Sequence, residues 1–338
     1  MISARGPCYG WAVPVREMTP DFSAAAEPYR RELLVHCYRM LGSVQDAQDL
    51  VQETMLRAWQ SWEHYDPELA SVRTWLYRIA TNACLNALEG RARRPLPSGV
   101  GQPFEDPDAA FVPGLEVPWL QPLPDRMLGS APDDPAMLAA ERSGLRLAVV
   151  AALQLLSAKQ RAALILRDVL GFTAAEVAAI LDMSTAAVNS ALQRARATFR
   201  GPRLDAKGLP TPEVAQRQVV DRYMSAFERA DVEGLTRLLA EEVVLEMPPV
   251  WNWYEGPVAY ARFMARVYDQ RGRDWRTLPS PANRQPAMAA YNRQGENYQL
   301  HTLQVFTVEG DAIVRTTVYQ DPQVFAVFDL PEILRLQR

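Results

Sequence analysis

Hydrophobic residues recur at helical spacing through the first part of the chain. The first stripe comprises Leu33, Leu34, Cys37, Met40 and Leu41, and these intervals place the side chains on one face of a helix that ends at Gly42. A second pattern begins after Ser43, an expected N-cap, and a third covers residues 71–90. Three amphipathic helices predict a helical unit over residues 21–94.

Residues 141–201 are predicted to form a second helical unit that contains a helix-turn-helix. Thr173 and Glu176 have the spacing of a capping box at the start of a short helix, and Ser184 is the expected N-cap of a longer one. This is the arrangement in which the second helix enters the major groove of DNA.

Residues 213–338 change from helical periodicity to the alternation that is typical of strands. Helices are expected over residues 212–230, 231–241 and 257–270, and strands over residues 243–247, 287–292, 298–308 and 312–319. Helices followed by a curved antiparallel sheet indicate an α+β domain. The predicted fold is therefore multidomain, with two all-α units and a C-terminal α+β unit.

Proline interrupts the chain between the two helical units. Residues 95–140 contain ten prolines, and seven acidic residues against one arginine, so they are expected to form an acidic, extended linker. Apolar side chains such as Phe111 and Trp119 indicate that part of the linker docks on a folded unit. Residues 202–212 are expected to be a second linker, and residues 1–20 a disordered or misassigned extension, with Met18 as an alternative start to Met1.

Composition limits the class of protein. The chain has 338 residues, a net charge of −4 and three cysteines that lie far apart in the sequence. These cysteines cannot form a disulfide framework or a cysteine-rich zinc site, so we expect a cytoplasmic protein without metal or cofactor. No apolar run approaches the ~20 residues that span a bilayer, and no membrane contact is expected.

Two segments of this slightly acidic chain are basic. Residues 184–203 carry four arginines and no acid, and residues 71–94 carry five arginines against one glutamate. On the second helix of the helix-turn-helix, amides can pair with bases and arginines with phosphates. The candidate DNA contacts there are Thr185, Ala186, Asn189, Ser190, Gln193, Arg194, Arg196 and Arg200. A solvated face of an ordinary helical hairpin is the alternative.

The basic segment of the first unit also contains aromatic residues, which suit single-stranded DNA because rings stack on unpaired bases. Trp75 lies in the apolar stripe and is expected in the core, whereas Tyr77 is the better candidate for an exposed ring. On the preceding helix, Asp46, Asp49 and Glu53 form a negatively charged face, which would repel the phosphates of DNA. That face is either solvated or a docking site for a basic protein surface.

Three sequence blocks resemble extracytoplasmic-function (ECF) sigma factors of the sigma-70 family. Residues 46–59 resemble region 2.2, residues 73–85 resemble regions 2.3 and 2.4, and residues 166–181 with 187–196 resemble region 4.2. The resemblance implies two partners, core RNA polymerase and promoter DNA. It assigns the docking on the β′ clamp helices to Asp46, Asp49, Gln52 and Glu53.

The resemblance also divides the promoter between the two helical units. The first unit would melt and read the −10 element, and the second would read the −35 element and rest on the β flap. The −10 candidates are Arg73, Tyr77, Arg78, Asn82, Arg91, Arg93 and Arg94. The long linker resembles the segment that runs toward the polymerase active centre.

The third unit contains a pattern, over residues 227–256, that resembles the SnoaL-like domain of the NTF2-like superfamily. Such folds enclose a conical pocket, and some relatives are cyclases or isomerases, which need a carboxylate base and an oxyanion donor. The pocket candidates are Glu246, Trp251, Trp253, Tyr254 and His301. A plain core, a pocket for an unknown small ligand and a catalytic site are the three alternatives.

The interpretation that uses most of the chain is an alternative sigma factor, not an enzyme, whose SnoaL-like domain regulates it in cis. A ligand-responsive helix-turn-helix regulator that acts without polymerase is the first alternative, and it leaves the acidic face unexplained. A SnoaL-like enzyme with a DNA-binding tether is the second, and it leaves both helical units without a role. A separate anti-sigma protein is a further candidate partner.

Overall fold

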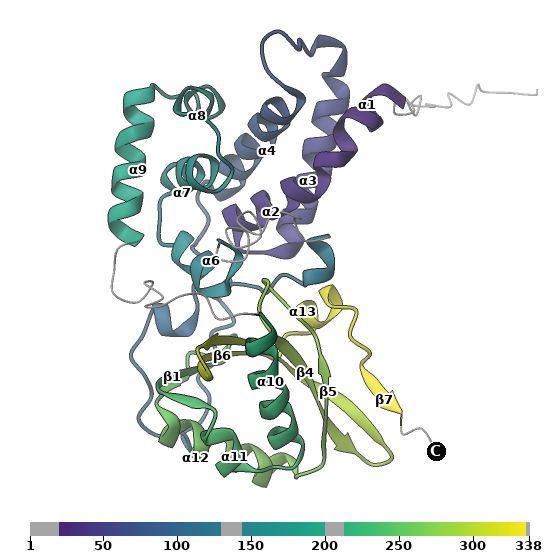
Figure 1. Cartoon of the computed structure of the whole chain (residues 1–338), viewed down its shortest axis with the longest axis vertical. Helices are drawn as coiled ribbons and strands as arrows, with labels where there is room; N and C mark the ends of the chain where they lie inside the picture. Colours follow the sequence, from purple (N-terminus) through teal and green to yellow (C-terminus); the bar gives the residue numbers. More distant parts are fainter. Residues whose placement is uncertain (1–19, 130–143, 200–212, 336–338) are drawn as a thin grey trace, which may run out of the picture.

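The first helical unit opens the part of the chain that the computed structural model describes, residues 20–129, 144–199 and 213–335 (Figure 1). It contains α1 (Pro20–Ala26), α2 (Arg30–Leu41), α3 (Val44–Gln60) and α4 (Val72–Leu88). Gly42 ends α2 with φ of 69°, a left-handed conformation that glycine adopts readily. The predicted N-cap is confirmed, because the Ser43 hydroxyl accepts a hydrogen bond from the backbone of Asp46.

The second helical unit contains α6 (Leu147–Leu153), α7 (Ala158–Leu164), α8 (Ala174–Leu181) and α9 (Thr185–Phe199). A π-helical turn, Ile165–Val169, extends α7. The predicted capping box is present: the Thr173 hydroxyl accepts from Glu176 N at 3.2 Å, and Glu176 Oε2 accepts from Thr173 N at 2.7 Å. Asp182, with φ of 50°, then ends α8 and starts the turn into α9. The helix-turn-helix geometry is therefore as predicted.

The third unit is a curved sheet with helices against one face. Its elements are α10 (Glu213–Glu228), α11 (Val232–Thr236), β1 (Leu239–Glu246), β2 (Trp253–Glu255), α12 (Pro257–Arg271), β3 (Trp275–Pro279), β4 (Ala287–Gln294), β5 (Asn297–Glu309), β6 (Ala312–Tyr319), α13 (Pro322–Val327) and β7 (Ile333–Arg335). The strand order is β2-β1-β6-β5-β4-β3, and β7 pairs with β5. The predicted α+β class is confirmed, although β1 runs parallel to β6 rather than antiparallel.

One predicted helix is shorter than expected. The pattern over residues 231–241 indicated a helix throughout, but α11 ends at Thr236 and β1 begins at Leu239. Leu239 is the register partner of Ile313 on β6. From Leu239 onward the extended conformation is more stable than a helix, because pairing with β6 supplies hydrogen-bond partners for backbone groups that would lack them at a helix end.

The core of the third unit lies between the sheet and α10 and α12. It gathers Tyr223 and Phe227 from α10, Phe263 from α12, and Trp275 and Phe306 from the strands. The rings of Phe227 and Trp275 meet edge to face at 5.3 Å. These aromatic contacts hold both helices on one face of the sheet.

The linker between the helical units packs along the third unit and is not a free spacer (Figure 1). Trp119 is buried and meets Trp251 edge to face, with ring centroids 5.1 Å apart. Gly114 N donates to Pro249 O at 2.8 Å, and Phe104 N donates to Trp253 O at 2.9 Å. The prediction that part of the linker docks on a folded unit is confirmed.

Candidate functional site

Helix α9 presents most of its predicted DNA contacts to solvent. Ser184 Oγ caps the helix by accepting from Ala187 N at 3.2 Å. The exposed candidates are Thr185, Ala186, Asn189, Gln193, Arg194 and Arg196, whereas Ser190 is half-buried. Val188 and Leu192 pack inward, so the opposite, polar face is the one available to a DNA groove. Arg200 lies outside the described residues.

Two arginines on this face already have partners within the protein. Arg194 donates to Ser190 Oγ at 2.6 Å. Arg196 forms a two-pronged ion pair with Asp168 of the π-helical turn, with nitrogen–oxygen distances of 2.6 and 2.9 Å. This carboxylate raises the pKa of the Arg196 guanidinium. A DNA phosphate would therefore have to compete with Asp168 for Arg196.

The second helical unit covers part of the predicted −10 surface on α4. Tyr77, expected to be exposed, is buried, and its ring lies 5.1 Å from Phe172, which precedes α8. The Arg73 guanidinium lies 4.5 Å from the Phe172 ring centroid and donates to Leu170 O at 3.4 Å. The expectation of an exposed Tyr77 is wrong in this arrangement, because residues 170–172 cover it.

The rest of the α4 segment is more open. Arg78, Asn82, Arg91 and Arg93 are exposed, and Arg94 is half-buried. Trp75 is only partly buried, in a cluster with Tyr65 at 5.0 Å and Trp62 at 5.9 Å. The expected core position of Trp75 is therefore only partly correct, and one edge of this aromatic cluster reaches solvent.

The acidic face of α3 is divided. Asp49 and Gln52 are exposed, whereas Glu53 pairs with Arg57 on the same helix. Asp46 pairs with Arg91 at 3.2 Å and with Arg94 at 2.9 Å. Asp46, a predicted polymerase contact, is thus tied to two predicted DNA contacts.

A buried arginine joins the two helical units, and sequence reasoning missed it. Arg161 on α7 donates to Met40 O at the end of α2, to Gln154 Oε1 at 2.7 Å and to Leu156 O at 3.2 Å. Burial lowers the pKa of the guanidinium to about 10. Gln154 in turn donates to Arg39 O at 3.3 Å. Backbone acceptors from both units therefore surround one cation.

A loop of the third unit contacts both helical units and the linker. Asn283, between β3 and β4, is fully buried. Its Nδ2 donates to the Tyr38 hydroxyl on α2 and to Leu145 O just before α6, both at 2.8 Å. Its Oδ1 accepts from Leu123 N of the linker, also at 2.8 Å. One side chain thus contacts both helical units and the linker, and no sequence pattern had marked it.

Gln285 repeats this contact two residues later. Its Oε1 accepts from Leu147 N, the first residue of α6, at 2.7 Å. Its Nε2 donates to Phe306 O on β5 at 3.0 Å and to Thr307 Oγ1 at 2.9 Å. The start of the second helical unit is therefore fixed to the sheet of the third.

Glu246, a predicted pocket residue, lies on the other face of the sheet. Its neighbours Leu245 and Met247 line the pocket, and alternate strand side chains point to opposite faces. Glu246 instead accepts from the Ser98 hydroxyl of the linker at 2.6 Å and from Arg315 at 2.8 Å. The prediction that Glu246 lines the pocket is wrong; it anchors the linker.

The three aromatic pocket candidates also lie outside the pocket lining. Trp253 is the register partner of Glu246 and shares its face, and Trp251 packs on the linker residue Trp119. Tyr254 is buried against Phe263, at 5.5 Å between ring centroids. These assignments are therefore wrong, because β2 and the loop before it face the linker and the core.

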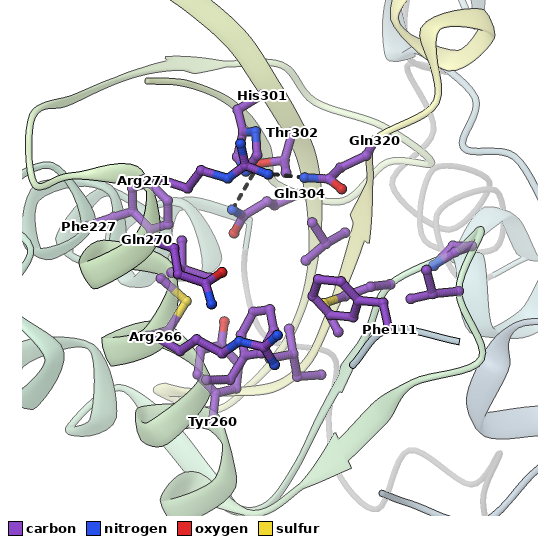
Figure 2. Close-up of a pocket in the computed structure, with 18 of the residues that line it drawn as sticks. Phe111, Phe227, Tyr260, Arg266, Gln270, Arg271, His301, Thr302, Gln304 and Gln320 are labelled. Carbon is purple, nitrogen blue, oxygen red and sulfur yellow. Dashed lines mark hydrogen bonds between the residues drawn. The ribbon is translucent and has the colours of Figure 1, made fainter. Parts of the chain in front are cut away.

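His301 is the one pocket candidate that the structure places in the lining of the cavity (Figure 2). The cavity has a volume of about 100 Å³ and lies between the sheet and α12. His301 Nε2 lies 3.1 Å from Gln320 Nε2, and burial together with Arg271 lowers the histidine pKa to about 4. The imidazole is therefore neutral near pH 7.

Within residues 20–129, 144–199 and 213–335, no group of three or more His, Cys, Asp or Glu side chains could hold a metal ion. Over the same ranges, no helix is long and apolar enough to cross a membrane.

Comparison with known proteins follows the same three parts. Residues 25–94 match the model of sigma-70 region 2, residues 146–199 that of sigma-70 region 4, and residues 220–316 that of the SnoaL-like domain. The chain is 46% identical over 326 residues to the ECF RNA polymerase sigma factor SigG of Mycobacterium tuberculosis, which covers 95% of this chain and 87% of SigG. It is 33% identical over 218 residues to SigJ of the same organism, covering 64% of this chain and 62% of SigJ.

A crystal structure of M. tuberculosis SigJ shares the fold, with a TM-score of 0.59, 22% identity, and coverage of 89% of this chain and 97% of that one. The order of domains, the helix-turn-helix and the identity to SigG along nearly the whole chain agree with one another. The chain belongs to the extracytoplasmic-function sigma factors of the sigma-70 family.

Proposed function

We propose that α3 binds core RNA polymerase, that α4 and the arginines after it contact the −10 element, and that α9 reads the −35 element. Asp49 and Gln52 leave an exposed polar face on α3 that suits a basic partner surface. Asn189 and Gln193 on α9 are exposed and can pair with adenine, while Arg194 suits a phosphate. In this proposal, promoter recognition and polymerase binding take place in the cytoplasm, where the polymerase acts.

Purified core polymerase and the chain's own upstream promoter test this division of roles. Asp49→Arg places a cation on the α3 face, so we expect loss of polymerase binding with unchanged affinity of the full chain for duplex DNA. Gln60→Arg, at the exposed end of the same helix, is the matched control and keeps polymerase binding. Equal loss of polymerase and DNA binding in Asp49→Arg contradicts the division of roles.

The third domain, in this proposal, regulates the sigma factor by holding it closed. The observation that carries this is the buried Asn283 side chain, which hydrogen-bonds to α2, to the start of the second helical unit and to the linker. While the units are held together, Phe172 covers Tyr77 and Arg73. Promoter DNA can reach that part of α4 only after the units separate, so closure opposes initiation.

Asn283→Ala removes these three side-chain hydrogen bonds and should raise the fraction of open molecules. We expect up to about a hundredfold more promoter-specific transcript at limiting sigma factor, because the three lost bonds are each worth about 1 kcal/mol net and about 1.4 kcal/mol is a factor of ten. Asn297→Ala, at an exposed site on β5, should match the wild type. A folded Asn283→Ala protein with unchanged or lower activity contradicts regulation by closure.

The same proposal gives the third domain a non-enzymatic role. The described pocket lining contains no Asp or Glu that could serve as the carboxylate base of an isomerase. Glu246 is the carboxylate that the sequence suggested for the pocket. It is hydrogen-bonded to Ser98, Arg315 and Thr317 on the opposite face of the sheet. The fold is thus used for docking and sensing rather than for proton transfer.

A further inference from the structure

The lining of the pocket in the third domain combines two arginines with apolar side chains. Arg266 and Arg271 of α12 are the charged side chains in its described lining, which holds no carboxylate. Gln304 and Gln320 lie near Arg271 and His301, whereas Arg266 lies across the cavity near Tyr260 (Figure 2). A site with two guanidinium groups and no acid favours an anion, and a carboxylate matches the planar fork of an arginine.

The apolar side chains of the same lining favour a hydrocarbon group. Leu245, Met264, Val267 and Val318 contribute apolar side chains from β1, α12 and β6. The volume of about 100 Å³ is somewhat smaller than the ~150 Å³ of an engineered apolar cavity that accepts benzene. The enclosed space therefore holds no more than one ring or a short branched chain, and the polar end of the ligand lies outside it, at the exposed Arg271.

One wall of this pocket belongs to the linker rather than to the third domain. Phe111 lies 6.2 Å from Phe263, ring to ring, and 5.2 Å from the Arg266 guanidinium (Figure 2). Arg266 also donates to Pro107 O and to Ala109 O, both at 2.7 Å. A molecule in the pocket would touch a side chain that is present only while the linker is docked.

We propose that this pocket binds a small organic carboxylate with an apolar body, and that the bound molecule strengthens docking of the linker. Arg271 receives the carboxylate, because Arg266 is already held by the linker carbonyls. Coupling follows from linkage: a ligand that contacts Phe111 binds the docked state better, so it shifts the population toward that state. The proposed ligand site is independent of the proposed regulation by the third domain. The effect of the ligand on transcription, in contrast, rests on that regulation.

Three probes of one shape and different charge test the ligand class on the full chain. Benzoate, benzamide and benzylamine are titrated by calorimetry, and benzoate should bind at least tenfold more tightly than benzamide, with no heat from benzylamine. Equal affinity for benzoate and benzamide, tighter binding of benzylamine, or no binding of any probe at millimolar concentration overturns the proposal. This series uses the wild-type protein, so it does not depend on a variant that folds.

Variants locate the site. Arg271→Gln should weaken benzoate binding about tenfold and leave benzamide unchanged, whereas the matched control Arg273→Gln, outside the pocket lining, should bind as the wild type does. Phe111→Ala should weaken benzoate binding severalfold, while Leu115→Ala, at an exposed linker position, should not. An unchanged benzoate affinity in Arg271→Gln overturns this placement of the carboxylate.

Hydrogen–deuterium exchange tests the coupling to the linker. Benzoate should slow amide exchange over residues 104–114, and exchange that is unchanged at saturation overturns the coupling. If benzoate binds and protects the linker but leaves transcription unchanged, the ligand site stands and regulation by the third domain fails. If benzoate does not bind while Asn283→Ala activates, regulation stands and the ligand site fails.

Discussion

Asp168 and Arg196 are paired through two hydrogen bonds, at 2.6 and 2.9 Å, across 28 positions of the sequence. The pair joins the π-helical turn to α9. A carboxylate therefore lies beside an arginine of the helix that is predicted to face DNA. Both side chains are partly exposed, at 33% for Asp168 and 52% for Arg196. Water screens the pair, and its attraction is modest.

Asp168→Asn should therefore increase the affinity for DNA. The change removes a negative charge near the phosphates and frees Arg196, and we expect binding about threefold tighter at low salt, with a steeper dependence on salt. Anisotropy of a labelled promoter duplex at two salt concentrations measures both. Asp182→Asn, in the exposed turn before α9, is the comparison, and a weaker complex in Asp168→Asn would contradict the expected effect.

The stability of the protein should fall as the pH drops below 6.5. Burial, together with Arg39, lowers the pKa of His36 to about 3, and burial together with Arg271 lowers that of His301 to about 4. Above pH 6.5 both residues are neutral in the folded and unfolded states. Below it the unfolded state binds protons that the folded state does not, so each histidine removes about 1.4 kcal/mol per pH unit.

Urea unfolding between pH 7 and pH 5 measures this loss. His36→Asn should flatten the pH dependence below 6.5, whereas the exposed His64→Asn should leave its slope as in the wild type. A slope that is the same in His36→Asn as in the wild type would show that His36 is not the group that titrates.

Glu246→Ala should release the start of the linker. The variant leaves Arg315, whose side chain is 22% exposed, without its 2.8 Å partner, and it removes the acceptor of Ser98. We expect a loss of about 3 kcal/mol in the free energy of unfolding and faster cleavage near residues 95–104 in limited proteolysis. Glu242→Ala, exposed on the same strand, is the control; cleavage at wild-type speed in Glu246→Ala would remove the anchoring role.

Arg161→Met tests the junction between the two helical units. The change leaves Met40 O and Leu156 O without a donor in a buried site, which should destabilise the protein by about 3 kcal/mol. Lys159→Met, exposed two residues earlier on α7, should change stability by less than about 0.5 kcal/mol. Chemical denaturation of both variants decides whether the arginine stabilises the junction.

The elements that sequence predicted well are those with local signals. The Ser43 cap, the Thr173–Glu176 capping box and the turn before α9 depend on neighbouring residues, and their geometry is as predicted. The docking of Trp119 was predicted because an apolar side chain in a spacer must be buried somewhere. Each of these inferences needed only a few consecutive positions.

What sequence could not predict depends on partners far along the chain. The periodicity of α4 separates its faces, but it does not tell that Phe172 covers Tyr77. Alternation on β1 puts Glu246 opposite Leu245, but it does not say which face is concave. Asn283 lies in a short irregular loop, and a single amide there carries no periodic signal. These three positions are set by tertiary contacts alone.

In the proposed regulation, docking of the linker on the third domain competes with the path that the linker would take in the polymerase. A segment held by Glu246 and Trp251 cannot at the same time run through a polymerase channel. Because the competitor is on the same chain, its effective concentration is set by tether length, on the order of millimolar, and does not fall on dilution. The closed fraction would then be the same at every expression level, and only a change that loosens the tethered contact would alter it.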